Sequence, residues 1–158
     1  MITYEFERNS YLLAKACNPI EKNRLIKAYH DIQKEIEYSG LTNKYGVVEV
    51  AEAELSAHTY YSISQSICRL EDKIIVDCGC GQGLQQVFFK NAKKYIGIDT
   101  QNTFFKICDN SEFIQGEIEE ILPTLDLKDS IGISVLCAMC FPTVNEAMKK
   151  YFNELVIL

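Results

Sequence analysis

A glycine-rich loop follows a short apolar run near the middle of the chain. In KIIVDCGCGQGLQQ, residues 73–86, the run ends at Asp77, and Gly79, Gly81 and Gly83 follow at alternate positions. Glycine reaches backbone angles that other residues avoid, and its missing side chain lets a ligand approach the main chain. A hairpin turn needs only one or two glycines. The segment therefore indicates a binding loop, with a tight turn or a metal clip made from its cysteines as the alternatives.

Charge and spacing discriminate between the ligands that such a loop could take. The dinucleotide fingerprint has a glycine where this chain has Leu84, and Asp77 would repel a pyrophosphate, so a nicotinamide cofactor is disfavoured. Asp77 can instead interact with an ammonium group, directly or through water. A second acid, Asp99, ends the later apolar run YIGID. We expect Asp99 at the same rim, accepting two hydroxyl hydrogen bonds, unless it only caps a following helix.

The elements that must position these residues alternate along the second part of the chain. Short apolar runs typical of buried parallel strands alternate with helical stretches after residue 72. The expected strands lie at residues 74–76, 95–98, 113–114, 131–137 and 155–158, and the expected helices at 84–91, 117–125 and 143–152, with Thr143 near the last cap. This order predicts an α/β fold with a doubly wound, mainly parallel five-stranded sheet, in which ligands bind beyond the carboxyl ends of the strands.

The first seventy residues have a different pattern, that of helices. Asn18 and Pro19 provide a capping side chain and a proline for the first helical turn. Apolar residues then recur at helical spacing, at Leu25, Tyr29, Ile32 and Ile36. A shorter helix is expected over residues 4–17 and a longer one over 48–70, with an inward stripe at Tyr60, Ile63, Ile67 and Leu70. We predict one domain, 1–158, in which a helical cap or lid (1–70) precedes a Rossmann-like core (71–158).

Composition excludes several classes of protein. The 158 residues carry a formal net charge of -6, which disfavours binding to a nucleic-acid backbone. Neither a secretory leader nor an apolar run long enough to span a membrane is apparent, so we expect a cytoplasmic protein without membrane contact. The odd count of seven cysteines favours reduced thiols, with Cys17, Cys68 and Cys108 as small buried residues.

Four further cysteines fall near the expected binding rim. Cys78 and Cys80 flank one loop glycine, and Cys137 and Cys140 lie near the end of the fourth strand, which should neighbour the first. Zinc and iron–sulfur clusters use such thiol sets. Alternate residues leaving a strand point to opposite faces, however, so a Cys-x-Cys pair is a poor pincer. We therefore predict no metal and interpret these residues as core thiols.

The two acidic motifs carry a family resemblance. VDCGCGQG followed by YIGID resembles the first and second motifs of the class I S-adenosylmethionine-dependent methyltransferases, and the resemblance extends over residues 73–158. It implies that the glycine loop wraps the amino-acid end of the cofactor and that Asp99 takes both ribose hydroxyls. Glu117 in Gln115-Gly116-Glu117 resembles the family's acid near the adenine amino group, or is simply a first-turn helix residue. The implied cofactor-binding residues are Asp77, Gly79, Cys80, Gly81, Gly83, Asp99, Thr100, Gln101 and Glu117.

The resemblance implies in-line methyl transfer from S-adenosylmethionine to a small molecule or a protein. Residues 130–141, SIGISVLCAMCF, lack the Asn/Asp-Pro-Pro-aromatic signature of the family's base-methylating members and have no Pro-Cys pair, so nucleic-acid bases are disfavoured acceptors. Methyl transfer asks little of side chains beyond positioning. No catalytic base is apparent, because His30 and His58 fall on expected helices as ordinary helix histidines.

The chain departs from the family at its end. Family members usually have seven strands, whereas this sequence stops at ELVIL after the fifth expected strand. An apolar last strand would leave an exposed sheet edge. We therefore expect a partner chain, such as a second copy in a homodimer, to cover that strand, or the chain to be a shortened form of a longer enzyme. The alternative function is a non-catalytic or truncated module that binds S-adenosylmethionine.

Overall fold

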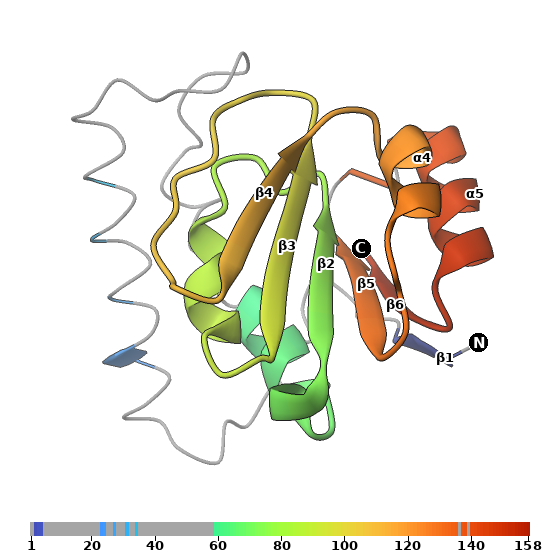
Figure 1. Ribbon diagram of the computed structural model, residues 1–158. Coiled ribbons are helices and arrows are strands. Elements are labelled where there is room, and N and C mark those ends of the chain that lie inside the picture. Colours follow the sequence, from blue (N-terminus) through green and yellow to red (C-terminus); the bar gives the residue numbers. More distant parts are fainter. Residues whose placement is uncertain are drawn as a thin grey trace.

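The structure of the chain, a computed structural model, describes residues 2–4, 23, 24, 27, 31, 34, 59–135, 137, 138 and 140–158 (Figure 1). The described residues between 23 and 34 are helical and exposed, as expected for a helix in this region. The predicted cap at Asn18 and Pro19, its apolar stripe from Leu25 to Ile36, and most of the predicted 4–17 helix lie outside the described residues. So do Cys17, His30 and His58.

Six strands form one parallel sheet in the described part of the chain. They are β1 (Ile2–Tyr4), β2 (Ile74–Cys78), β3 (Lys94–Asp99), β4 (Ser111–Gln115), β5 (Ser130–Ser134) and β6 (Glu154–Ile157). Their order across the sheet is β1-β6-β5-β2-β3-β4, and every neighbouring pair is parallel. Strands β2 to β6 are the five predicted strands in the order 3-2-1-4-5, so the prediction of a parallel α/β fold is confirmed (Figure 1).

The sixth strand corrects two expectations. Tyr4 ends β1 rather than beginning a helix, and the β-branched and aromatic sequence Ile-Thr-Tyr suits a strand. Strand β1 pairs with β6 through the register Ile2↔Glu154 to Tyr4↔Val156. Because β6 lies between β1 and β5, the last strand is not the exposed sheet edge that we expected.

The helices after residue 73 lie where they were predicted but differ in kind, whereas the helix predicted over residues 48–70 ends at residue 66, before a turn. Residues 59–66 are helical, and η1 (Leu70–Asp72), η2 (Leu84–Phe89), α4 (Ile118–Ile121), η3 (Leu122–Thr124) and α5 (Pro142–Tyr151) follow. The predicted helix at 84–91 is the six-residue 3-10 helix η2, and the one at 117–125 is α4 continued by η3. Helix α5 begins at Pro142, with Phe141 rather than Thr143 at its cap. None of the described helices has the length and apolar content needed to traverse a bilayer.

Alternation along the strands divides the core between the two faces of the sheet. On one face Ile75, Ile131 and Ile133 pack with residues 59–67 and η2. On the other face Val76, Cys78 and Ile98 pack with α4, η3 and α5, including the fully buried Met148. Figure 1 shows α4 and α5 together on one side of the strands. The predicted stripe of Tyr60, Ile63, Ile67 and Leu70 does pack inward, so the 59–66 helix and the turn after it contribute to this core.

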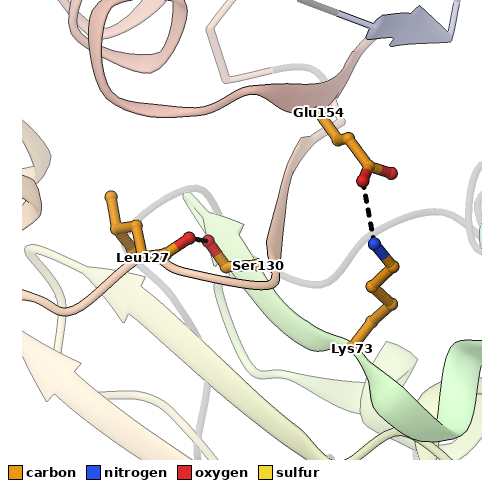
Figure 2. A network of polar contacts seen from close by, with 4 residues as sticks. All are labelled: Lys73, Leu127, Ser130 and Glu154. Carbon is orange, nitrogen blue, oxygen red and sulfur yellow. Dashed lines mark hydrogen bonds and ion pairs between the residues drawn. The ribbon is translucent and has the colours of Figure 1, made fainter.

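Polar contacts join the amino ends of the strands, opposite the glycine loop. Lys73 Nζ, just before β2, donates to Glu154 Oε1 of β6 at 2.8 Å, with only 21% and 22% of the two side chains exposed. Ser130 Oγ donates to the Leu127 carbonyl in the turn that begins β5 (Figure 2). The first contact joins the starts of β2 and β6, and the second fixes the start of β5.

Candidate functional site

The glycine loop lies at the carboxyl end of β2, between β3 and β5. Within the sheet, β3 pairs with one edge of β2 and β5 pairs with its other edge. The order of the strands therefore reverses at β2, and the loops after β2 and β5 flank this topological switch point. Open α/β sheets bind their ligands in the crevice at this point. The register pairs Asp77 with Gly97 and Cys78 with Ile98, which places the end of β3 beside the loop.

Asp99 joins the end of β3 to the glycine loop. Its Oδ2 accepts a hydrogen bond from the Gly81 N–H at 2.9 Å, and its Oδ1 accepts one from the Gln101 N–H, also at 2.9 Å. The carboxylate is partly exposed, and each of its oxygens keeps a lone pair for another donor. Residues 100–110 contain no helix, so Asp99 closes a turn and is not a helix cap. The two predicted parts of the site, the loop and the second acid, are therefore in direct contact.

The three loop glycines have left-handed backbone angles but different surroundings. A side chain at Gly79 would meet Cβ and Sγ of Cys137 at 2.5 Å, and one at Gly83 would meet the Phe104 ring at 2.2 Å. At Gly81, where φ is +56°, no atom of the described residues lies within 4 Å of the same position. Thus Gly79 and Gly83 make room for the protein's own side chains, and Gly81 is the loop glycine that faces open space.

The N–H groups of the loop are already bonded within the protein. Those of Gly79 and Cys80 donate to the Ile98 carbonyl at 2.8 and 3.1 Å, and that of Gly83 donates to the Cys80 carbonyl at 3.0 Å. The Gly81 N–H donates to Asp99. A phosphate cradle presents several N–H groups to its ligand. Four N–H groups of this loop already donate hydrogen bonds within the protein. This argues against a phosphate ligand, in addition to the departure from the dinucleotide fingerprint at Leu84.

Asp77 is a fully buried carboxylate behind the loop. Its Oδ2 accepts hydrogen bonds from Tyr95 Oη at 2.5 Å and from Gln85 Nε2, while the buried Oδ1 has no hydrogen-bond partner in the part of the chain that the structure describes. Burial raises the pKa of Asp77 to about 6; the bonds from Tyr95 and Gln85 oppose this rise, and the charge of Asp99 adds to it. A cation near the loop would stabilise the ionised form.

Two glutamines of η2 hold the site together. Gln85 Nε2 also donates to the Cys80 carbonyl at 2.9 Å. Gln86, with none of its surface exposed, donates to the Gly83 and Phe105 carbonyls at 2.7 and 2.8 Å and accepts the N–H groups of Ile107 and Cys108, both at 2.9 Å. Sequence reasoning missed both residues. Two adjacent amides in the otherwise apolar run LQQVFF were the available indication, because buried polar side chains must find partners.

The remaining predicted site residues lie around Asp99. Thr100 is exposed, and its carbonyl accepts Gln115 Nε2 at 3.0 Å, while Gln101 contributes its N–H to Asp99. Glu117 is exposed at the cap of α4, and its carbonyl accepts the N–H groups of two residues in that helix. The helix-end interpretation of Glu117 therefore describes its position. The Gly116 N–H donates to the Asp99 carbonyl at 3.0 Å, which brings Glu117 to the same rim.

The cysteines near the rim occupy different environments. The buried Cys80 side chain is directed toward Gly97, where an added Cβ would lie 2.7 Å from its sulfur, and Cys78 packs in the core beneath α5. Cys137 is half-buried against Gly79, and Cys140 is exposed. No group of three or more His, Cys, Asp or Glu residues in the described ranges is arranged to hold a metal ion. Cys68 is exposed, contrary to expectation, because it lies in the turn after the 59–66 helix.

No protein-family model matches the chain, and no curated protein sequence is significantly similar to it.

Proposed function

We propose that this chain is an S-adenosylmethionine-dependent methyltransferase that acts on a small molecule or a protein. The observation that carries the proposal is the contact between Asp99 and Gly81, in which the acid ending β3 lies 2.9 Å from the N–H of the loop glycine that faces open space. A ligand over Gly81 would reach both free lone pairs of the Asp99 carboxylate. Two adjacent hydroxyls, as on a ribose, match such a carboxylate.

The charge of the rim favours a cationic ligand that carries no phosphate. Three segments at this rim follow β2, β3 and β5. Residues 77–86, 99–105 and 134–141 include Asp77 and Asp99 but no lysine or arginine. The first basic residue after β3 is Lys106, which is exposed. Phosphate ligands are normally met by basic side chains or free N–H groups. S-Adenosylmethionine instead carries an ammonium, a sulfonium and a ribose, so its chemistry suits two nearby carboxylates.

The residues of the chain have separate tasks in this proposal. Asp99 binds the ribose hydroxyls and holds Gly81 in place, and Gly81 lets the ligand approach the backbone. Asp77, behind the loop, supplies negative charge. Its hydrogen-bond partners Tyr95 and Gln85 are both uncharged and do not neutralise it. When bound, S-adenosylmethionine supplies a methyl group on a sulfonium, which is already a good leaving group. The protein then has chiefly to orient the acceptor.

Calorimetric titration of the full chain with S-adenosylmethionine and S-adenosylhomocysteine tests the binding step. We expect Asp99→Ala to weaken S-adenosylhomocysteine binding about 10- to 100-fold, as for the loss of hydrogen bonds to a charged group. The matched control is Asp109→Asn, an exposed acid in the segment that follows Asp99. Because Asp99 also holds Gly81, circular dichroism and a thermal melt of each variant must show that it folds. Wild-type dissociation constants weaker than about 1 mM would reject the proposal.

The role of Asp77 can be tested with a ligand that lacks the aminoacyl end. Methylthioadenosine keeps the ribose and adenine of S-adenosylhomocysteine but has no ammonium group. We expect the wild type to prefer S-adenosylhomocysteine and Asp77→Asn to lose most of this preference, whereas Asp99→Ala should weaken both ligands. An unchanged preference in Asp77→Asn would remove Asp77 from the site.

Methyl transfer is tested separately from binding. Incubation with methyl-labelled S-adenosylmethionine and fractionated metabolites or proteins should label an acceptor, and Asp99→Ala should reduce the label. Tight binding without label on any fraction would favour the non-catalytic module instead.

A further inference from the structure

A pair of thiols flanks the switch point on the side opposite Asp99. Cys137 and Cys140 lie between β5 and α5, and the Cys140 N–H donates to the Cys137 carbonyl at 2.9 Å. A turn closed by such a bond brings its first and fourth Cα atoms within about 7 Å. Disulfides join residues whose Cα atoms are usually about 4.4–6.8 Å apart. The backbone of this turn therefore already has the approximate span of a disulfide.

We propose that Cys137 and Cys140 form a reversible disulfide, which makes the loop after β5 a redox-sensitive element beside the glycine loop. Cys140 is exposed and can meet an oxidant, whereas Cys78 and Cys80 are 0% and 4% exposed. A Cys-x-x-Cys pair in a turn before a helix is an arrangement in which thiol–disulfide exchange is common. The inference does not depend on the proposed methyltransferase activity.

The oxidant in this reaction is a low-molecular-weight disulfide such as oxidised glutathione. The Cys140 thiolate, having lost its proton to solvent, attacks one sulfur of the oxidant; a mixed disulfide forms and one glutathione thiolate leaves. The deprotonated Cys137 sulfur then attacks the Cys140 sulfur, the protein disulfide forms and the second glutathione leaves. Two protein thiols are oxidised and one glutathione disulfide is reduced to two thiols. Excess reduced glutathione reverses both steps.

The environment of Cys137 sets the order of these two steps. Burial, followed by the nearby negative charges of Asp99 and Asp77, raises the pKa of Cys137 to about 11. Near neutral pH this thiol is almost entirely protonated, so the exposed Cys140 reacts first. The closing step needs the Cys137 thiolate, and its rate should rise about tenfold for each unit of pH below that pKa.

Closing the disulfide would alter the glycine loop. The Cys137 side chain fills the space that Gly79 leaves, with its sulfur 2.5 Å from the position of an added Cβ. We expect the Cys137 side chain to turn away from Gly79 when its sulfur bonds to that of the exposed Cys140, because a side chain changes rotamer more readily than a turn moves. The Gly79 and Cys80 N–H groups, bonded to the Ile98 carbonyl, would then lose packing that protects them.

The test uses the reduced full chain equilibrated with mixtures of oxidised and reduced glutathione, then quenched in acid, alkylated and mapped by peptide mass spectrometry. We expect a Cys137–Cys140 disulfide that disappears in excess reduced glutathione. Cys137→Ser should accumulate a glutathione adduct on Cys140, and Cys140→Ser should form neither product. Cys68→Ser, which removes an exposed thiol elsewhere, is the matched control and should behave as the wild type.

Amide hydrogen exchange supplies the structural readout, which needs no ligand. Oxidation of the wild type should accelerate exchange at Gly79 and Cys80, and Cys140→Ser under the same conditions should show no change. A disulfide that forms without this acceleration would overturn the predicted effect on the loop. The absence of a Cys137–Cys140 disulfide at every glutathione ratio, or a stable adduct on Cys140 in the wild type, would overturn the proposal. Neither result bears on whether S-adenosylhomocysteine binds.

Discussion

Replacing Asp77 by asparagine should change how the stability of the protein depends on pH. Burial raises the pKa of this carboxyl from 3.8 to about 6 in the folded chain. Between these values the folded state holds a proton that the unfolded state has lost, so stability is fully present below 3.8 and decreases as the pH rises through 6. At 1.36 kcal/mol for each unit of pKa, the difference amounts to about 3 kcal/mol.

Asparagine removes this dependence while retaining most of the contacts. Its carbonyl can accept the bonds that Tyr95 and Gln85 donate to Oδ2, and its amide takes the place of the unpartnered Oδ1. The buried amide carries a cost of its own, so the absolute stability of Asp77→Asn is less informative than its variation with pH. The difference in unfolding free energy between variant and wild type should move in favour of the variant by about 3 kcal/mol from about pH 3 to about pH 8.

Urea unfolding under reducing conditions, followed by circular dichroism, measures this difference at each pH. Asp109→Asn, which alters an exposed carboxylate, is the control and should follow the wild type. A flat difference across the window would refute the reasoning, because the carboxyl would then titrate alike in both states. A difference that moves in favour of the wild type as the pH rises would show instead that the structure stabilises the charged form. With saturating S-adenosylhomocysteine, the proposed ammonium contact predicts that the dependence shrinks.

Three other predictions concern the supports of the site. Gly79→Ala should destabilise the chain by about 2–4 kcal/mol, because the added methyl meets Cys137 and the backbone angle is left-handed. Gly81→Ala also has a left-handed backbone angle but meets none of the described residues, so it should cost about 1–2 kcal/mol. Equal losses of unfolding free energy in urea would contradict this geometry. Gln86→Leu should cost about 3–5 kcal/mol of unfolding free energy and should speed hydrogen exchange at the Ile107 and Cys108 N–H groups, which lose their acceptor. A loss below about 1 kcal/mol would contradict the role of Gln86 in holding these segments together. A double-mutant cycle of Lys73→Met and Glu154→Gln should give a coupling of about 1 kcal/mol that falls in high salt, and a salt-independent value would argue against an ionic contact.

The period of the apolar residues was enough to predict the parallel sheet. Runs such as Ile74-Ile75-Val76 are apolar on both faces, and only strands covered by helices on both sides can bury them. The spacing also placed Asp77 and Asp99 at the same end of the sheet, since the ends of parallel strands coincide. Strand β1 escaped prediction because three residues carry no periodicity, and its pairing with β6 joins opposite ends of the chain.

From residue 73 onward the sequence by itself determined the order of the strands and helices, the position of the glycine loop and the two acids near it, because these depend on residue type and local spacing. Tertiary structure alone decided that Cys137 and Phe104 fill the spaces beside Gly79 and Gly83, that Gln86 ties the loop to residues 105–108, and that Asp77 lies buried against Tyr95. Each of these contacts joins segments far apart in sequence. Their geometry depends on how two strands and their loops pack, and a local sequence pattern does not contain that information.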